Sequence, residues 1–444
     1  AGDSVIDAEG LVLAPGFIDA HSHHDLQLAE IPDALAAVSQ GITTIAAGQD
    51  GEHAYPLADL FAELEAVPSA INVASYVGHG TLRGRVMGDD YQREATDQEV
   101  QEMVDLLRSE MAAGALGLSS GLEYDPGSFS NTRELIALAS ATAAMGGRYI
   151  THIRSEDQYF WEALDEAIRI GREAGIAVRI SHIKLAMTRW WGQTERLRSV
   201  LDAARESGVD ISADLYPYPA WNAGFSWLAT LFPSRDLDRR EGAEYILNDM
   251  LSPQGILLPE FIPDPAYNGL TIEQIALQRE SDPATTLMEL LKADIEAGSR
   301  SPMLGFAMSE PDIEAIMAWP HTIIGSDGEL EGPHPRGFGS FTRVLGHYVR
   351  KRNVMPLEEA IRKMTHRSAQ DLGIEQRGLI RPGYHADLVL FDPAAVNDRA
   401  TADEPHLPSV GIHQVWVNGQ TVWIGDSAES QVSGHRPGQV IRRK

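Results

Sequence analysis

The chain has 444 residues, of which 43% are hydrophobic and 23% charged, enough for two or three domains or for one barrel with additions. Its net charge of -28 argues against nucleic acid as a partner, because phosphate backbones are bound through a local excess of Lys and Arg. No apolar run reaches the roughly 18 residues of a membrane span, so we expect no membrane partner. Cysteine is absent, which excludes disulfides, thiolate metal ligands and a cysteine nucleophile.

Between about residues 15 and 330, short apolar or β-branched runs alternate with charged segments of helical periodicity. Eight such βα units predict an α/β fold, a (β/α)8 TIM-like barrel, more readily than an open doubly wound sheet. Helices are expected at 97–113, 156–174 and 193–207. The predicted strands are 16–21, 42–47, 71–77, 115–119, 148–153, 177–182, 210–215 and 322–327.

Two regions depart from this alternation. The interval 219–320, rich in aromatic residues, Pro and Gly, is interpreted as an insertion or lid over the barrel mouth, between strands seven and eight of a barrel domain spanning 15–371. Residues 372–444 contain short alternating runs, and Asn-Gly at 418–419 between two of them predicts a hairpin. Residues 1–14 have the pattern of strand remnants, so a small β domain from both chain ends is expected.

Metal-ligating side chains stand where the predicted strands end. If residues 16–21 form a strand, its period of two directs His21 and His23 to the same side. Each histidine alone is also compatible with a core position or a surface turn. Imidazoles and carboxylates together suit Zn²⁺, Mn²⁺ or Co²⁺, and the sequence does not choose among them. The expected metal ligands are His21, His23, Asp50, His152, His182 and Asp327.

Further motifs accompany these ligands. They are Pro-Gly-Phe-Ile-Asp-Ala-His-Ser-His-His-Asp at 15–25, Thr-His-Ile-Arg at 151–154, Ser-His-Ile-Lys at 181–184, Asp-Leu-Tyr-Pro-Tyr at 214–218, Gly-Ser-Asp-Gly at 325–328 and His-Pro-Arg-Gly-Phe-Gly at 334–339. With them, nearly the whole chain resembles the N-acyl-D-amino-acid deacylase (D-aminoacylase) branch of the metal-dependent amidohydrolase superfamily.

The resemblance implies a distorted barrel with a small β-sandwich and a divalent metal, most readily Zn²⁺, in one tight site with room for a second, weaker one. It implies hydrolysis of N-acyl-D-amino acids to a carboxylate and a free D-amino acid. One departure concerns the turn after strand two, where the family ordinarily has Gly-Asn-Cys-Gly and this chain has Gly48-Gln49-Asp50-Gly51. Asp50 therefore stands in place of a thiolate and is a harder donor.

The resemblance also suggests catalytic roles. Asp327 matches the superfamily's aspartate that accepts a proton from water and returns it to the leaving amine, although an Asx-turn role is the alternative. Tyr124 is a candidate donor to the carbonyl oxygen, with core packing as its alternative.

A substrate carboxylate needs local positive charge in so acidic a protein. We expect Arg336 with Lys184 to bind it, each with a rim salt bridge as the alternative. Arg154, Tyr216 and Tyr218 are further substrate-binding candidates. Tryptophans at 190, 191, 221 and 227 are candidates for an apolar wall, or else for core.

Two other function classes stay open. Another amidohydrolase reaction, on dipeptides or cyclic imides, is disfavoured because such relatives usually carry a lysine after strand four, where this chain has Gly117-Leu118-Ser119-Ser120. A catalytically inactive barrel scaffold would be expected to have lost the histidines. The expected partners are a small N-acylated amino acid and, as an open alternative, further copies of the chain. The expected location is the cytoplasm, with the periplasm and secretion as alternatives.

Overall fold

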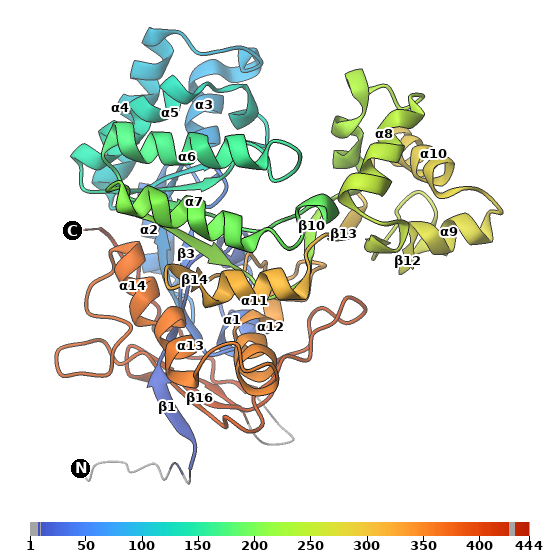
Figure 1. The fold of residues 1–444 in the computed structure, drawn as a ribbon. Coiled ribbons are helices and arrows are strands. Elements are labelled where there is room, and N and C mark those ends of the chain that lie inside the picture. The colour runs from blue at the N-terminus through green and yellow to red at the C-terminus, as the bar shows by residue number, and fades with distance from the viewer. Residues whose placement is uncertain (1–7, 9, 426–430, 444) are drawn as a thin grey trace.

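The computed structural model describes residues 8, 10–425 and 431–443. Its largest part alternates strands with helices that cover the outside of the strands (Figure 1). The strands run parallel in two sheets, ordered β2-β3-β4 and β14-β9-β8-β7-β6-β5, and each of the eight predicted runs contains a strand. Their bounds are β2 (Phe17–Asp19), β3 (Ile42–Ala47), β4 (Asn72–Ser75), β5 (Val77–Gly78), β6 (Gly117–Gly121), β7 (Arg148–His152), β8 (Val178–Ile180), β9 (Ile211–Leu215) and β14 (Thr322–Ile324).

The first and last of these strands lie side by side. The amide of Ala20, just after β2, donates to the Ile324 carbonyl at 3.4 Å, and Ser22 forms a parallel bridge with Gly328. Buried side chains such as Ile18 of β2 and Ile323 of β14 belong to one small core that is separate from the main core. The carboxyl ends of all these strands therefore meet on one face, where a barrel carries its chemistry.

The helices around the strands begin and end where local chemistry dictates. Thr96 and Glu99 form a capping box at the start of α4 (Asp97–Ala113), and Gly114, with φ 116°, ends it as predicted. No described helix is long and apolar enough to cross a membrane. The other α-helices of this part are α1 (Leu35–Val38), α2 (Leu57–Ala66), α3 (His79–Met87), α5 (Thr132–Ala144), α6 (Phe160–Ala174), α7 (Thr194–Glu206), α11 (Glu310–Ala318), α12 (Arg336–Arg343), which continues into a π-helix (Val344–Lys351), α13 (Leu357–Met364) and α14 (His366–Leu372).

A separate lobe projects from the segment between β9 and β14 (Figure 1). We call residues 220–306 the insertion lobe. It contains an antiparallel sheet ordered β10-β13-β11-β12, flanked by three α-helices. Its main elements are β10 (Ala220–Gly224), a 3-10 helix (Phe225–Leu231), α8 (Arg240–Tyr245), a π-helix (Ile246–Met250), β11 (Ile256–Leu258), β12 (Leu270–Thr271), α9 (Ile272–Gln278), α10 (Pro283–Glu296) and β13 (Pro302–Phe306).

The two chain ends share one five-stranded sheet, ordered β1-β15-β16-β17-β18. Asn418 and Gly419 both have positive φ, as a two-residue hairpin turn between β16 and β17 requires, which confirms the predicted hairpin. The second sheet of the expected sandwich is not among the described residues, and residues 1–7 and 9 of the predicted N-terminal remnant lie outside them. The strands are β1 (Val12–Pro15), β15 (Leu388–Phe391), β16 (Ile412–Val417), β17 (Gln420–Ile424) and β18 (Gln431–Val432).

Candidate metal centre and active site

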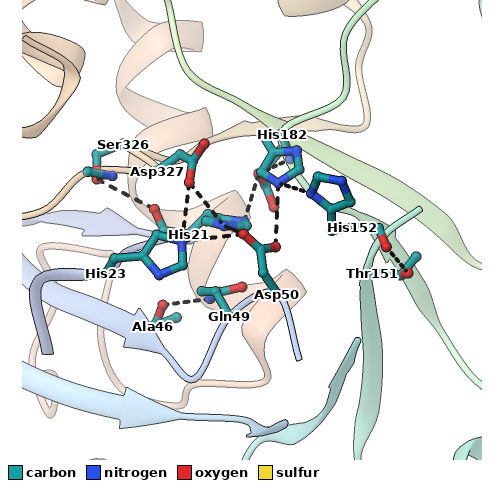
Figure 2. A network of polar contacts seen from close by, with 12 residues as sticks. His21, His23, Ala46, Gln49, Asp50, Thr151, His152, His182, Ser326 and Asp327 are labelled. Carbon is teal, nitrogen blue, oxygen red and sulfur yellow. Dashed lines mark hydrogen bonds and ion pairs between the residues drawn. The ribbon is translucent and has the colours of Figure 1, made fainter. Parts of the chain in front are cut away.

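Four side chains from three strand ends converge on one point (Figure 2). His21 and His23 follow β2, Asp50 follows β3, and Asp327 follows β14. The Nε2 atom of His23 lies 3.3 Å from Oδ2 of Asp50 and 3.2 Å from Oδ1 of Asp327. The Nε2 atom of His21 lies 3.5 Å from each of the same two oxygens. We call these four residues the first donor group.

A second donor group shares Asp50. His152 ends β7, and His182 follows β8. The Nε2 atom of His182 lies 3.4 Å from Oδ1 of Asp50 and 3.1 Å from Nδ1 of His152. Asp50 therefore directs one carboxylate oxygen towards each group (Figure 2).

Both groups have the properties of a metal site. The Nε2 atom of His21 and Oδ1 of Asp50 are buried and have no hydrogen-bond partner among the described residues, which is costly for atoms that nothing else binds. The nitrogen–oxygen separations of 3.2 to 3.5 Å in the first group match the ~3.4 Å expected between two ligands of a tetrahedral Zn²⁺. The donors present therefore fit a divalent metal.

Backbone strain concentrates at the same place. Asp50, His182 and Asp327 have φ values of 50°, 33° and 50°, in a left-handed region that non-glycine residues rarely adopt. Such conformations cost free energy and persist where the surrounding structure enforces them, often at functional sites. Three strand ends thus turn sharply in order to direct their ligands into one space.

Three carboxylates that the sequence analysis did not select orient the histidines. Oδ1 of Asp214 lies 3.4 Å from Nδ1 of His21 and accepts the backbone N–H of His182 at 2.7 Å. Glu156 lies 3.1 Å from Nδ1 of His182, and Glu123 lies 3.0 Å from Nε2 of His152. Histidine ligands commonly use their second nitrogen in this way, which fixes the tautomer. The motif at 214–218 contained Asp214, whereas no spacing rule pointed to the two glutamates.

The carboxylates dominate the electrostatics of the site. Burial alone would lower the pKa of His182, and Lys184 lowers it further, but Glu156, Asp50 and Asp327 together raise it to about 10. Burial would likewise raise the pKa of Asp327, yet the Arg336 guanidinium and the nearby imidazoles hold it below its ordinary value. The site is therefore strongly anionic and stabilises positive charge at its centre.

A cavity of about 630 Å³ opens over both donor groups. Lys184, Arg336, Tyr216 and Tyr124 all line it, together with His23, Asp50, His152, His182 and Asp327. Lys184 Nζ lies 2.5 Å from Oε1 of Glu156, and a guanidinium nitrogen of Arg336 lies 2.5 Å from Oδ2 of Asp327. Both cations also face the Tyr216 ring, whose hydroxyl has no hydrogen-bond partner among the described residues.

Some expected residues lie elsewhere. Arg154 does not line the cavity, because its guanidinium pairs at 2.7 Å with Glu166, in the middle of α6. Tyr218 lies behind the cavity wall, where its hydroxyl is 3.5 Å from both the Pro335 carbonyl and an Asp398 oxygen. The tryptophans at 190 and 191 also lie outside the lining, whereas those at 221 and 227 line it.

The fold and this donor set identify the class. The model of the amidohydrolase family (Amidohydro_3) matches residues 4–233 and 287–423, so the chain belongs to the amidohydrolase family.

Within the family, the chain groups with the N-acyl-D-amino-acid deacylases. It is 37% identical to D-aminoacylase of Alcaligenes xylosoxydans xylosoxydans over 100% of this chain and 90% of the relative. It is 38% identical to N-acyl-D-aspartate deacylase of the same organism over 99% and 87%. The solved structure of N-acyl-D-glutamate deacylase from Bordetella bronchiseptica, with zinc and a phosphonate inhibitor, is 37% identical, covers 98% of this chain and 90% of that chain, and gives a TM-score of 0.84.

Proposed function

We propose that this chain hydrolyses the amide bond of N-acyl-D-amino acids to a carboxylate and a free D-amino acid. The observation that carries the proposal is one cavity that combines two metal-donor groups with the cationic pair Lys184 and Arg336. A metal centre suits amide hydrolysis, and a cationic pair beside it suits a substrate whose carboxylate lies next to the scissile bond. The D configuration is taken from the names of the relatives.

The first and second donor groups would hold the metal, most readily zinc. A divalent ion, when bound, supplies Lewis acidity towards the carbonyl and activates water. The two oxygens of Asp50 face different groups, so this carboxylate would contribute to both and take the place of the family's cysteine. An all-nitrogen-and-oxygen donor set accepts harder ions such as Mn²⁺ and Co²⁺ beside Zn²⁺.

Asp327 would act as general base and then as general acid. Its Oδ1 faces the first donor group, and its Oδ2 is paired with Arg336, so the carboxylate is held between the metal centre and the substrate clamp. Tyr124 is 42% exposed, and partial loss of water around its hydroxyl together with the carboxylates of Asp50 and Glu156 raises its pKa above the ordinary value. The hydroxyl is therefore protonated at neutral pH and can donate to the carbonyl oxygen.

Lys184, Arg336 and Tyr216 would bind the substrate carboxylate. His334 supports this arrangement, since its Nδ1 accepts the Arg336 backbone N–H at 3.0 Å while its Nε2 lies 3.0 Å from the Ala220 carbonyl. For the architecture, we propose that the two parallel sheets form one closed barrel at 15–371, with the insertion lobe over its mouth and the terminal sheet as a second domain.

Metal-dependent assays with paired enantiomers test this function. The protein is stripped with a chelator, reloaded with Zn²⁺, Mn²⁺ or Co²⁺, and supplied with N-acetyl-D-methionine or its L enantiomer. We expect turnover only after reloading and only with the D substrate. Elemental analysis of Asp50→Ala beside the wild type should show reduced metal content. Hydrolysis that survives full metal removal, or a preference for the L substrate, would contradict the proposal.

A further inference from the structure

Overall likeness does not choose the side chain of the substrate. The relatives named for D-amino acids in general, for D-aspartate and for D-glutamate match this chain to nearly the same degree. The residues that line the cavity are more informative than overall sequence identity, because they show which charges the substrate side chain would meet.

The lysine and the arginine of the cavity both pair with carboxylates. Among the described lining residues, Lys184 and Arg336 are the only lysine and arginine. Lys184 lies 2.5 and 2.7 Å from the two oxygens of Glu156, and Arg336 lies 2.5 Å from Asp327. The proposed function assigns both to the α-carboxylate of the substrate, so no further lysine or arginine of the described lining remains for a second carboxylate.

Negative charge is abundant by contrast. Two carboxylates of the lining, Glu52 and Glu329, stand outside both donor groups. A like charge placed among such groups is strongly disfavoured. The acidic residues of the lining are Asp25, Asp50, Glu52, Glu123, Glu156, Asp157, Asp327 and Glu329.

The insertion lobe supplies an apolar wall to the same cavity. Trp221 and Trp227 pack edge to face with ring centroids 5.6 Å apart, and Met250 adds a thioether. The Trp221 indole lies over Gly305, its partner in the β10–β13 register. Only a glycine leaves room there, because an added Cβ would lie 2.6 Å from the indole. The polar residue of this wall, Asn222, carries an uncharged amide.

Resting on the proposed function, we infer that the cavity selects substrates with uncharged, apolar side chains and rejects acidic ones. The side chain would meet indole and thioether surface on the lobe, and the acidic groups of the lining outnumber its lysine and arginine. Trp221 and Trp227 are specificity-determining residues, and Gly305 is a positioning residue for Trp221.

A panel of N-acetyl-D-amino acids tests the inference on the metal-loaded enzyme. We expect kcat/KM for the methionine and leucine derivatives to exceed that for the glutamate and aspartate derivatives by about 100-fold or more, as like-charge repulsion predicts. A glutamate or aspartate derivative that equals or exceeds the methionine derivative would overturn the inference and leave the proposed function standing. Absence of turnover on every D substrate would refute both.

A matched glycine pair tests the apolar wall. Gly305→Ala should displace Trp221 and raise KM for the leucine derivative by about 10-fold, a loss typical of a disturbed apolar pocket, with a smaller change in kcat. Gly224→Ala, in the same sheet, is the control, because its Cβ would meet nothing within 4 Å. Equal KM values in both variants, with both folded by circular dichroism, would contradict the role of Trp221.

Discussion

The parallel-sheet part and the insertion lobe line one cavity with different chemistry. Every residue of the two donor groups comes from the carboxyl ends of parallel strands, whereas the lobe contributes Trp221, Trp227 and Met250, an apolar wall. The amidohydrolase family match includes Trp221 and Trp227 and omits residues 234–286 of the lobe, among them Met250. Our proposals therefore assign bond cleavage to the strand ends and the choice of substrate side chain to the lobe.

This division has a physical basis. Strand ends are fixed by hydrogen bonds to their neighbours, so they hold ligands to within the tolerance that a metal demands. An insertion packs on the scaffold through fewer constraints and tolerates change in its side chains, which suits a surface that discriminates among substrates. Substitutions of Asp327, Arg179 and Arg336 alter the parallel-sheet part and should leave the insertion lobe intact.

Asp327→Asn should have the largest effect. The amide cannot accept the proton that hydrolysis releases, so kcat should fall by about 10⁴-fold, the upper range for a lost general base. The backbone contact from the Asp327 N–H to the His21 carbonyl, at 2.8 Å, remains available, so the variant should fold. Steady-state kinetics with thermal unfolding measures both. Asp157→Asn, in the same lining but outside the donor groups, is the control, and near-normal turnover in Asp327→Asn would remove that residue from the mechanism.

The sequence predicted those features that depend on local residues and missed those that depend on tertiary contacts. The alternation of strands and helices is local, so the eight strands and the helix at 97–113 were predictable from periodicity, capping and the closing glycine. His21 was predicted on the strand itself, yet β2 ends at Asp19, and the sharp turns at Asp50 and Asp327 bring the ligands together instead. Such turns depend on tertiary contacts that no window of sequence contains.

Residues that act through distant partners were harder to predict. Glu123 and Glu156 come from loops after β6 and β7, and each meets a histidine from another segment. Arg154 lies two residues after His152, the last residue of β7, but it pairs with Glu166 of α6 and does not line the cavity. Position after a strand therefore places a residue near the mouth and does not give the direction of its side chain.

Arg179→Ala should produce the largest loss of stability. Arg179, 2% exposed on β8, pairs with Asp214 at 3.0 Å and Asp371 at 3.1 Å, and its removal takes the guanidinium away from two buried carboxylates. We expect the free energy of unfolding to fall by about 3–5 kcal/mol in urea titrations. Arg240→Ala is the matched control in the insertion lobe, since its pairs with Glu244 and Asp282 are half exposed and should leave the urea midpoint unchanged. Equal losses would mean that the buried network contributes no more than a surface pair.

Arg336→Ala should have a smaller and more selective effect on activity. Loss of the guanidinium removes a charge-assisted contact to the substrate carboxylate, which should raise KM for N-acetyl-D-methionine by about 10- to 100-fold. N-acetyl-D-methioninamide, which lacks that carboxylate, should lose much less, and Arg336→Lys should recover part of the binding. Because Arg336 also pairs with Asp327, some decrease in kcat is expected on both substrates. The contribution of Arg336 to binding the substrate carboxylate is therefore measured by the ratio of the two KM changes. Equal KM changes on both substrates would mean that Arg336 only holds Asp327 in place.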